Sequence, residues 1–117
     1  MINDNTPVLP TDLQVMKAIH MDVHERADAL YTLLRHIQEN KRHVTVEQSR
    51  LIYERRAVLL ESRDKLHEHV LKSTVEKDEV RKGFDRQILQ IVETQIGKID
   101  SLMQELHEYI PTPQQPE

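Results

Sequence analysis

The chain has no cysteine and no tryptophan, and its 117 residues include only two glycines, three tyrosines and one phenylalanine. Without cysteine, neither a disulfide nor a thiolate metal site can form. The shortage of aromatic residues requires an aliphatic core, and the shortage of glycine leaves long stretches without a helix breaker. These absences favour a single all-α domain with one thin core.

Long apolar runs are also missing. No window approaches the roughly 18 apolar residues of a membrane span, and the N-terminus lacks the basic and apolar regions of a signal peptide. We therefore expect a cytoplasmic protein with no membrane partner. The net charge is −4, from 16 basic and 20 acidic residues. Because phosphate contacts need clustered positive charge, this balance argues against nucleic acid as a partner.

The charge is unevenly distributed along the chain. Residues 41–65 carry seven basic and four acidic side chains, whereas residues 76–108 carry eight acidic and five basic ones. The two segments should attract each other, and a local basic face should remain on the middle helix. This face is either solvated or contacts an acidic partner.

Apolar residues three and four positions apart predict three amphipathic helices, at about 12–39, 46–72 and 74–109. Short connections make neighbouring helices antiparallel, so we expect an elongated antiparallel three-helix bundle. Neither Gly nor Pro separates the second helix from the third, and one continuous rod is the alternative to a turn. Each helix follows a possible capping box, formed by Thr11 and Gln14, by Thr45 and Gln48, and by Ser73 and Glu76.

Prolines and polar residues mark the two ends of this domain. Residues 1–10 are expected to be a disordered lead-in, and residues 111–117 a disordered proline-rich tail. The bundle should occupy residues 11–110.

The middle helix is apolar on two sides. At about 100° per residue, one side forms the expected core face: Leu51, Ile52, Val58, Leu59, Leu66 and Val70. A second stripe repeats every seven residues at Val46, Tyr53 and Leu60, behind a basic row that includes Arg56 and Arg63. A helix with two apolar sides has more than one partner, so this stripe predicts a surface that binds another protein.

The third helix has an apolar arc wider than one neighbour needs. It either packs against two helices or leaves one edge for a partner. We expect Leu89, Ile96 and Met103 to form that edge, beside the second stripe of the middle helix.

Two pairs of polar residues have other interpretations. Arg55 on the expected core face and Gln95 on the apolar arc either form a ligand-binding pair, or they pair with each other or extend to solvent and so fix helix register. His20 and His24 are four residues apart, a spacing at which two imidazoles can share a metal ion, and Asp28 extends the same edge, but no Glu-x-x-His pairs that would complete a site appear elsewhere. We therefore predict no metal site and no cofactor.

One segment, Phe84 to Val92, resembles the helical chorismate mutase segment with its Asp-x-x-Ile-Leu pattern. The arginines of that family pattern would fall at Gln95 and Asp78 in this chain. A site that binds a dianion through arginines does not work with an amide and a carboxylate there. We expect no enzymatic activity.

Over residues 20–109 the chain resembles the FliT-type flagellar export chaperones and the related FlgN-type chaperones. The first helix, the Tyr53–Leu60 run with its Arg-x-x-Leu-Leu motif, and the acidic stretch from Thr74 to Glu79 carry this resemblance. It implies a helical cytoplasmic chaperone that keeps a flagellar export substrate, such as the filament cap or a hook-associated protein, competent for type III secretion.

The resemblance and the second stripe together predict a set of partner-binding residues. A partner helix would use aliphatic anchors for affinity and acidic groups for the basic row. The alternative is a homodimeric helical module of a secretion, phage or regulatory system. The predicted contact residues are Val46, Tyr53, Arg56, Leu60, Arg63, Leu89, Ile96 and Met103.

Overall fold

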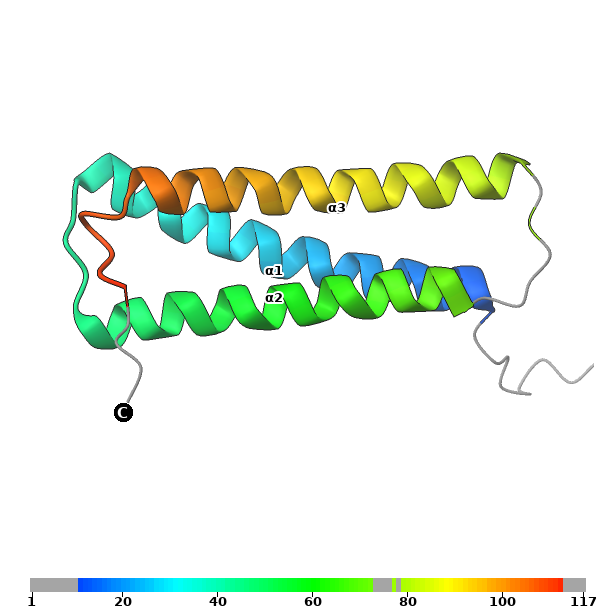
Figure 1. The fold of residues 1–117 in the computed structure, drawn as a ribbon, viewed down its shortest axis with the longest axis horizontal. Helices are drawn as coiled ribbons and strands as arrows, with labels where there is room; N and C mark the ends of the chain where they lie inside the picture. The colour runs from blue at the N-terminus through cyan, green and yellow to red at the C-terminus, as the bar shows by residue number, and fades with distance from the viewer. Residues whose placement is uncertain (1–10, 73–76, 78, 113–117) are drawn as a thin grey trace, which may run out of the picture.

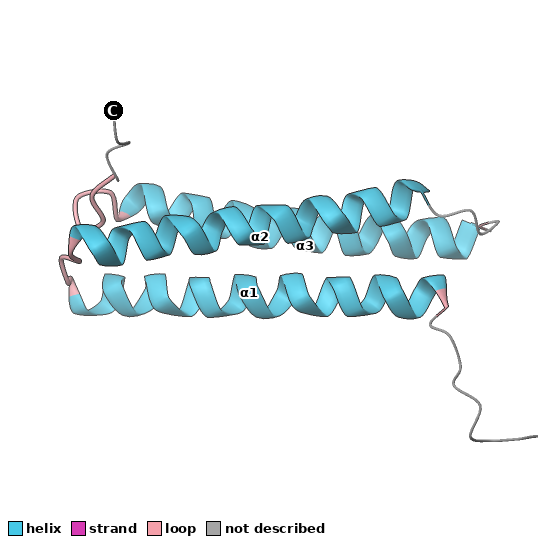
Figure 2. Cartoon of the chain, turned by 90° about the horizontal axis from the view of Figure 1, so that it is seen from below, coloured by secondary structure: helices cyan, strands magenta, loops and turns pink. Residues whose placement is uncertain are grey.

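The computed structural model describes residues 11–72, 77 and 79–112, and within them it contains three α-helices and no strand. The helices are α1 (Asp12–Asn40), α2 (Val46–Lys72) and α3 (Glu79–Glu105). Figure 1 shows α2 and α3 along the two sides of α1, and Figure 2 shows the same bundle turned by 90°. Contacts of Asp12 with Arg81 and of Gln38 with Glu105 join like ends of α1 and α3. These two helices are therefore parallel, and α2 runs antiparallel to both.

The predicted three-helix bundle is confirmed. The bounds of α1 and α2 agree with the prediction to within one residue. Because α2 ends at Lys72 and α3 begins at Glu79, the continuous rod is excluded. The predicted start of the third helix, at residues 74–76, lies outside the described residues, and at its other end residues 106–109 form turns in place of the last predicted helical turn. None of the helices in the described part of the chain has the length and apolar character needed to cross a bilayer.

Local capping residues set where the first two helices begin. The Thr11 backbone N–H donates to Gln14 Oε1 at 2.9 Å, and the Gln14 N–H donates to Thr11 Oγ1 at 3.1 Å. Thr45 and Gln48 make the same two bonds, at 2.9 and 3.1 Å. Two of the predicted capping boxes are therefore confirmed. The third, at residues 73 and 76, lies outside the described residues.

Helix α1 ends at a left-handed residue. Lys41 has φ 46° and ψ 46°, and its N–H donates to Gln38 O at 3.3 Å while the Arg42 N–H donates to Ile37 O at 3.2 Å. This arrangement satisfies the last carbonyls of a helix and usually has glycine at the left-handed position. The chain accepts the steric cost of a lysine there.

The core is a continuous aliphatic column between the three helices. Ile52, Leu59 and Leu66 of α2 recur every seven residues and are at most 2% exposed. They pack with buried residues of the other two helices and of the segment after α3: Met16, Val23, Ala27, Leu30, Leu34, Ile37, Ile88, Val92, Ile96, Ile99, Leu102, Leu106 and Ile110. This column confirms the expected thin core without tryptophan or phenylalanine among its buried members.

The segment after α3 closes one end of the bundle. The Val44 N–H donates to Tyr109 O at 3.0 Å, and Ser49 Oγ donates to Pro111 O. The rings of His43 and Tyr109 lie 4.7 Å apart, and Ile110 is 2% exposed. In Figure 1 this orange-to-red segment lies against the α1–α2 connection. Residue 110 therefore belongs to the core.

A buried polar cluster joins all three helices at the opposite end. Asp85 of α3 accepts from Lys77 Nζ at 2.8 Å and from Arg81 Nε at 3.0 Å. Arg81 also donates to Asp12 at 2.6 Å, and Asp12 lies 2.9 Å from His69 Nε2 of α2. Burial alone would raise the pKa of Asp85, but the hydrogen bonds from Lys77 and Arg81 outweigh it and lower that pKa. The carboxylate is thus charged and fully partnered.

Candidate functional site

Part of the expected core face of α2 is exposed. Leu51 and Val58 were expected in the core but are 54% and 36% exposed, so that prediction is wrong. The side chains of α2 that face the core are those of Ile52, Leu59 and Leu66. Ile52 and Leu59 each come one position after Leu51 and Val58 in the sequence. Since each position is about 100° of rotation, Leu51 and Val58 lie at the flank that borders α1.

The predicted second stripe lies at the other flank, which borders α3. Val46 is 54% exposed. Tyr53 and Leu60 are half-buried and pack against the core, as do Leu89 and Met103 of α3. We call these five residues, with Ile96, the α2–α3 seam. Ile96 is itself a core residue at 5% exposure, so a partner could reach its side chain only if the bundle opened.

The basic row beside the seam pairs with acidic residues of α3. Arg56 Nε donates to Asp100 Oδ1 at 2.7 Å, and its Nη2 donates to Asp100 Oδ2 at 3.2 Å. Arg63 Nη1 lies 3.9 Å from Glu93 Oε2. The attraction expected between the basic and acidic segments thus acts between α2 and α3 of the same monomer. Val46 is the residue of the seam with the largest exposed aliphatic surface.

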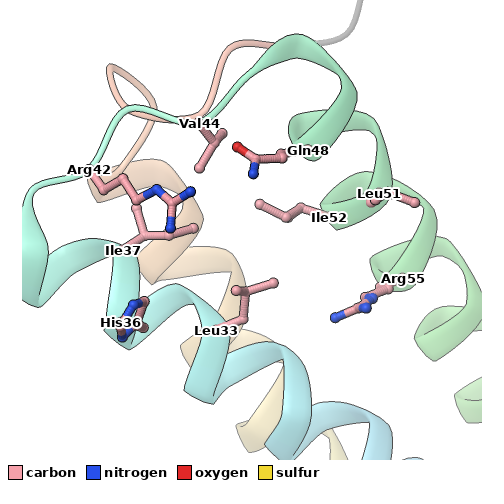
Figure 3. A pocket seen from close by; sticks show the side chains of 9 residues that line it. All are labelled: Leu33, His36, Ile37, Arg42, Val44, Gln48, Leu51, Ile52 and Arg55. Atoms are coloured by element: carbon pink, nitrogen blue, oxygen red, sulfur yellow. The ribbon is translucent and has the colours of Figure 1, made fainter.

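A hollow apolar surface lies between α1 and α2, and we call it the α1–α2 groove. It has two connected sections that share Leu51 and Arg55. Figure 3 shows the section nearer the α1–α2 connection, where Leu33 and Ile52 face each other across the hollow and Arg55 extends towards it. The apolar lining of both sections is Ala29, Leu30, Leu33, Ile37, Val44, Leu51, Ile52 and Val58.

The rim of the groove is basic. Arg42, Arg55 and Arg26 line it along its length, against one carboxylate, Glu54. Arg26 forms an ion pair with Asp22 at 3.1 Å. The guanidinium groups of Arg42 and Arg55 have no ion-pair partner among the described residues. The groove therefore combines apolar surface with cations that are free to pair.

The sequence contained a signal for this groove in Arg55. An arginine at the centre of a core face is rare unless it is paired. Leu51, Arg55 and Val58 are spaced as i, i+4 and i+7, which places them on one helix side. The arginine thus indicated that this side faces solvent. The remaining groove residues, on α1 and the connection, come together only in the folded bundle.

Arg55 and Gln95 do not contact each other, so of the alternatives for this pair the direct contact is excluded. Arg55 is exposed on the α1–α2 side. Gln95 Nε2 lies 2.8 Å from His24 Nδ1, across the α1–α3 contact. Gln95 thus links α3 to α1.

His20 and His24 of α1 do not form a metal cluster with other described residues. Among the residues that the structure describes, no group of three or more His, Asp or Glu side chains has the geometry to hold a metal ion. Burial, and then the nearby His24, lowers the pKa of His20. His20 is therefore stabilised in its neutral form within the helix contact.

The comparisons with known proteins leave the interpretation to the chain's own residues. No protein-family model, no curated protein and no solved structure matches it.

Proposed function

We propose that this protein is a cytoplasmic binding protein that holds a second protein on the exposed side of α2, without catalysis and without a cofactor. The observation that carries the proposal is the exposure of Leu51 and Val58, which are seven residues apart on a bundle whose core is complete without them. Burying an exposed aliphatic side chain contributes about 1.5 to 3 kcal/mol. Two such anchors supply a useful part of a protein–protein affinity.

The partner class we propose is a flagellar export substrate, the filament cap or a hook-associated protein. The resemblance of the Tyr53–Leu60 run to export chaperones supports this class, as does the slender helical bundle. Such a client would be held until secretion because its own apolar helices aggregate when they are exposed.

Helix-in-groove recognition fits the geometry of the surface. An amphipathic helix lays aliphatic side chains into a groove between two helices at intervals of about two turns. The α1–α2 groove supplies such a track, whereas most of the predicted seam is covered by the protein's own packing.

The test is complex formation with purified filament-cap and hook-associated proteins, measured by size-exclusion chromatography. We expect a complex with the wild type and its loss in Leu51→Asp, because a carboxylate cannot replace an apolar anchor in a dry contact. Leu71→Asp is the matched control, because Leu71 is 82% exposed and does not line the groove. It should keep the complex.

Two results would overturn the proposal. The first is that none of these flagellar subunits forms a complex with the folded wild type. The second is a tight homodimer that buries Leu51 and Val58, which would make a second copy of the chain the occupant of this surface.

A further inference from the structure

The rim charge of the α1–α2 groove identifies the chemistry of its occupant. We infer that the groove binds an amphipathic helix with aliphatic residues seven positions apart and carboxylates beside them. This inference rests on the proposed function only in that the occupant is a segment of a protein. It places the occupant in the groove and not at the α2–α3 seam. It also requires the occupant to carry acidic residues beside its apolar ones.

The spacing of the apolar anchors suits a helix. Leu51 and Val58 are separated by about 10 Å along α2 at the standard rise per residue. A helix lying along the groove brings one side chain to this interval every seven residues. Val44 continues the apolar lining at one end, so the track extends beyond these two anchors.

The charge balance of the rim favours an acidic occupant. Arg42 and Arg55 face one lining carboxylate, Glu54, and the third arginine, Arg26, is paired with Asp22, so the rim keeps a net positive charge. A docked helix excludes water from the neighbouring guanidinium groups, and this strengthens both attraction and repulsion. A carboxylate on the occupant would pair with Arg55 or Arg42, whereas a lysine there would leave like charges together.

The availability of these two arginines separates the groove from the seam. Arg56 already forms two hydrogen bonds with Asp100, and Arg63 lies within ion-pair distance of Glu93. An acidic partner at the seam would have to compete with those internal pairs. At the groove, Arg42 and Arg55 have no ion-pair partner within the described part of the chain. They can therefore pair with an occupant without breaking an internal ion pair.

The test uses two synthetic helical peptides and isothermal titration calorimetry. Both carry leucines seven residues apart, one with flanking glutamates and the other with lysines at the same positions. The wild type should bind the acidic peptide about tenfold or more tightly than the basic one, a difference that added salt reduces. The Arg42→Glu/Arg55→Glu double variant should reverse this preference. Arg50→Glu, on the same helix but away from the groove lining, should keep it.

Backbone amide shifts on adding the acidic peptide locate the binding surface. They should be largest around Leu33, Leu51 and Val58. Shifts centred on Tyr53 and Leu60, equal affinity for the two peptides, or no binding of the acidic peptide would each overturn the inference. A flagellar subunit that still forms a Leu51-dependent complex in those cases would leave the proposed function standing. Conversely, selective binding of the acidic peptide without any flagellar complex would remove the proposed client and keep the inference.

Discussion

At the residue scale, Asp85 is the most consequential polar side chain. Its carboxylate has 7% of its surface exposed and accepts hydrogen bonds from Lys77 and Arg81. The Lys77 ammonium also donates to Val70 O at 3.0 Å, so this carboxylate helps to hold the connection onto the end of α2. Removing one partner of a buried ion pair leaves the other charges uncompensated.

We predict that Asp85→Asn lowers the free energy of unfolding by about 3 kcal/mol. Because the pKa of Asp85 is lowered in the fold, the ionised carboxylate contributes to the free energy of unfolding at pH values above the unfolded-state pKa of about 3.9. That contribution is lost as the pH falls through the lower folded-state pKa. Urea unfolding at neutral and acidic pH measures both effects, and the gap between wild type and variant should narrow in acid.

Asp64→Asn is the control for this experiment. Asp64 is 70% exposed and pairs with its neighbour Arg63, so its replacement should change stability by less than about 1 kcal/mol. Equal stability of Asp85→Asn and Asp64→Asn would contradict the role assigned to the polar cluster.

Residue-scale prediction from the sequence succeeded where the interaction is local. The Thr11–Gln14 and Thr45–Gln48 boxes each join residues three positions apart, so their geometry needs no tertiary information. The cluster around Asp85 joins residues up to 69 positions apart, as in the Arg81–Asp12 bond. The Arg81–Asp85 pair follows the i, i+4 spacing of a helix, but no spacing rule along the chain could have identified the contact with Asp12.

At the element scale, the end of α1 contains an avoidable strain. Lys41 adopts a left-handed conformation that costs an L-residue about 1 kcal/mol and costs glycine little. We predict that Lys41→Gly raises the free energy of unfolding by about 1 kcal/mol. Thermal and urea unfolding would measure this gain.

Glu39→Gly provides the opposite case on the same turn. Glu39 lies inside α1, is 65% exposed at its side chain, and has helical geometry. Glycine there should destabilise the protein by about 1 kcal/mol. A loss of stability in Lys41→Gly similar to that in Glu39→Gly would contradict the observed cap.

The sequence did not determine which side of α2 faces the core. Aliphatic or aromatic side chains lie on both sides of the buried row of α2. Leu51 and Val58 lie on one side, and Tyr53 and Leu60 lie on the other. Periodicity cannot choose between two such flanks. In the structure, Arg56 and Arg63 pair with Asp100 and Glu93 of α3. These pairs lie on the Tyr53 flank, which borders α3, and the Leu51 flank is exposed beside α1.

At the scale of the whole molecule, composition and periodicity were sufficient for the architecture. Three helices with few breakers and short connections have one simple antiparallel arrangement, and the structure adopts it. The partner-binding residues expected from the sequence stay a prediction, and most of them pack along the α2–α3 contact, whereas the α1–α2 groove lies on the other flank of α2. The groove also needs Ala29 and Leu33 of α1 and Val44 of the connection, which only folding brings beside α2.

The central claim is that Leu51 and Val58 are open to a partner in the free protein. Because the chain has no cysteine, single variants Leu51→Cys and Val58→Cys report this directly through thiol-labelling rates under native conditions. Ser49→Cys is a near-isosteric buried control, since Ser49 is fully buried on the same helix. It can react only through opening of the fold.

We predict that the thiols at positions 51 and 58 react about tenfold or more faster than the thiol at position 49, at rates that do not depend on protein concentration. Protection at 51 and 58 equal to that at 49 would contradict the account, because the surface would then be covered within the free protein.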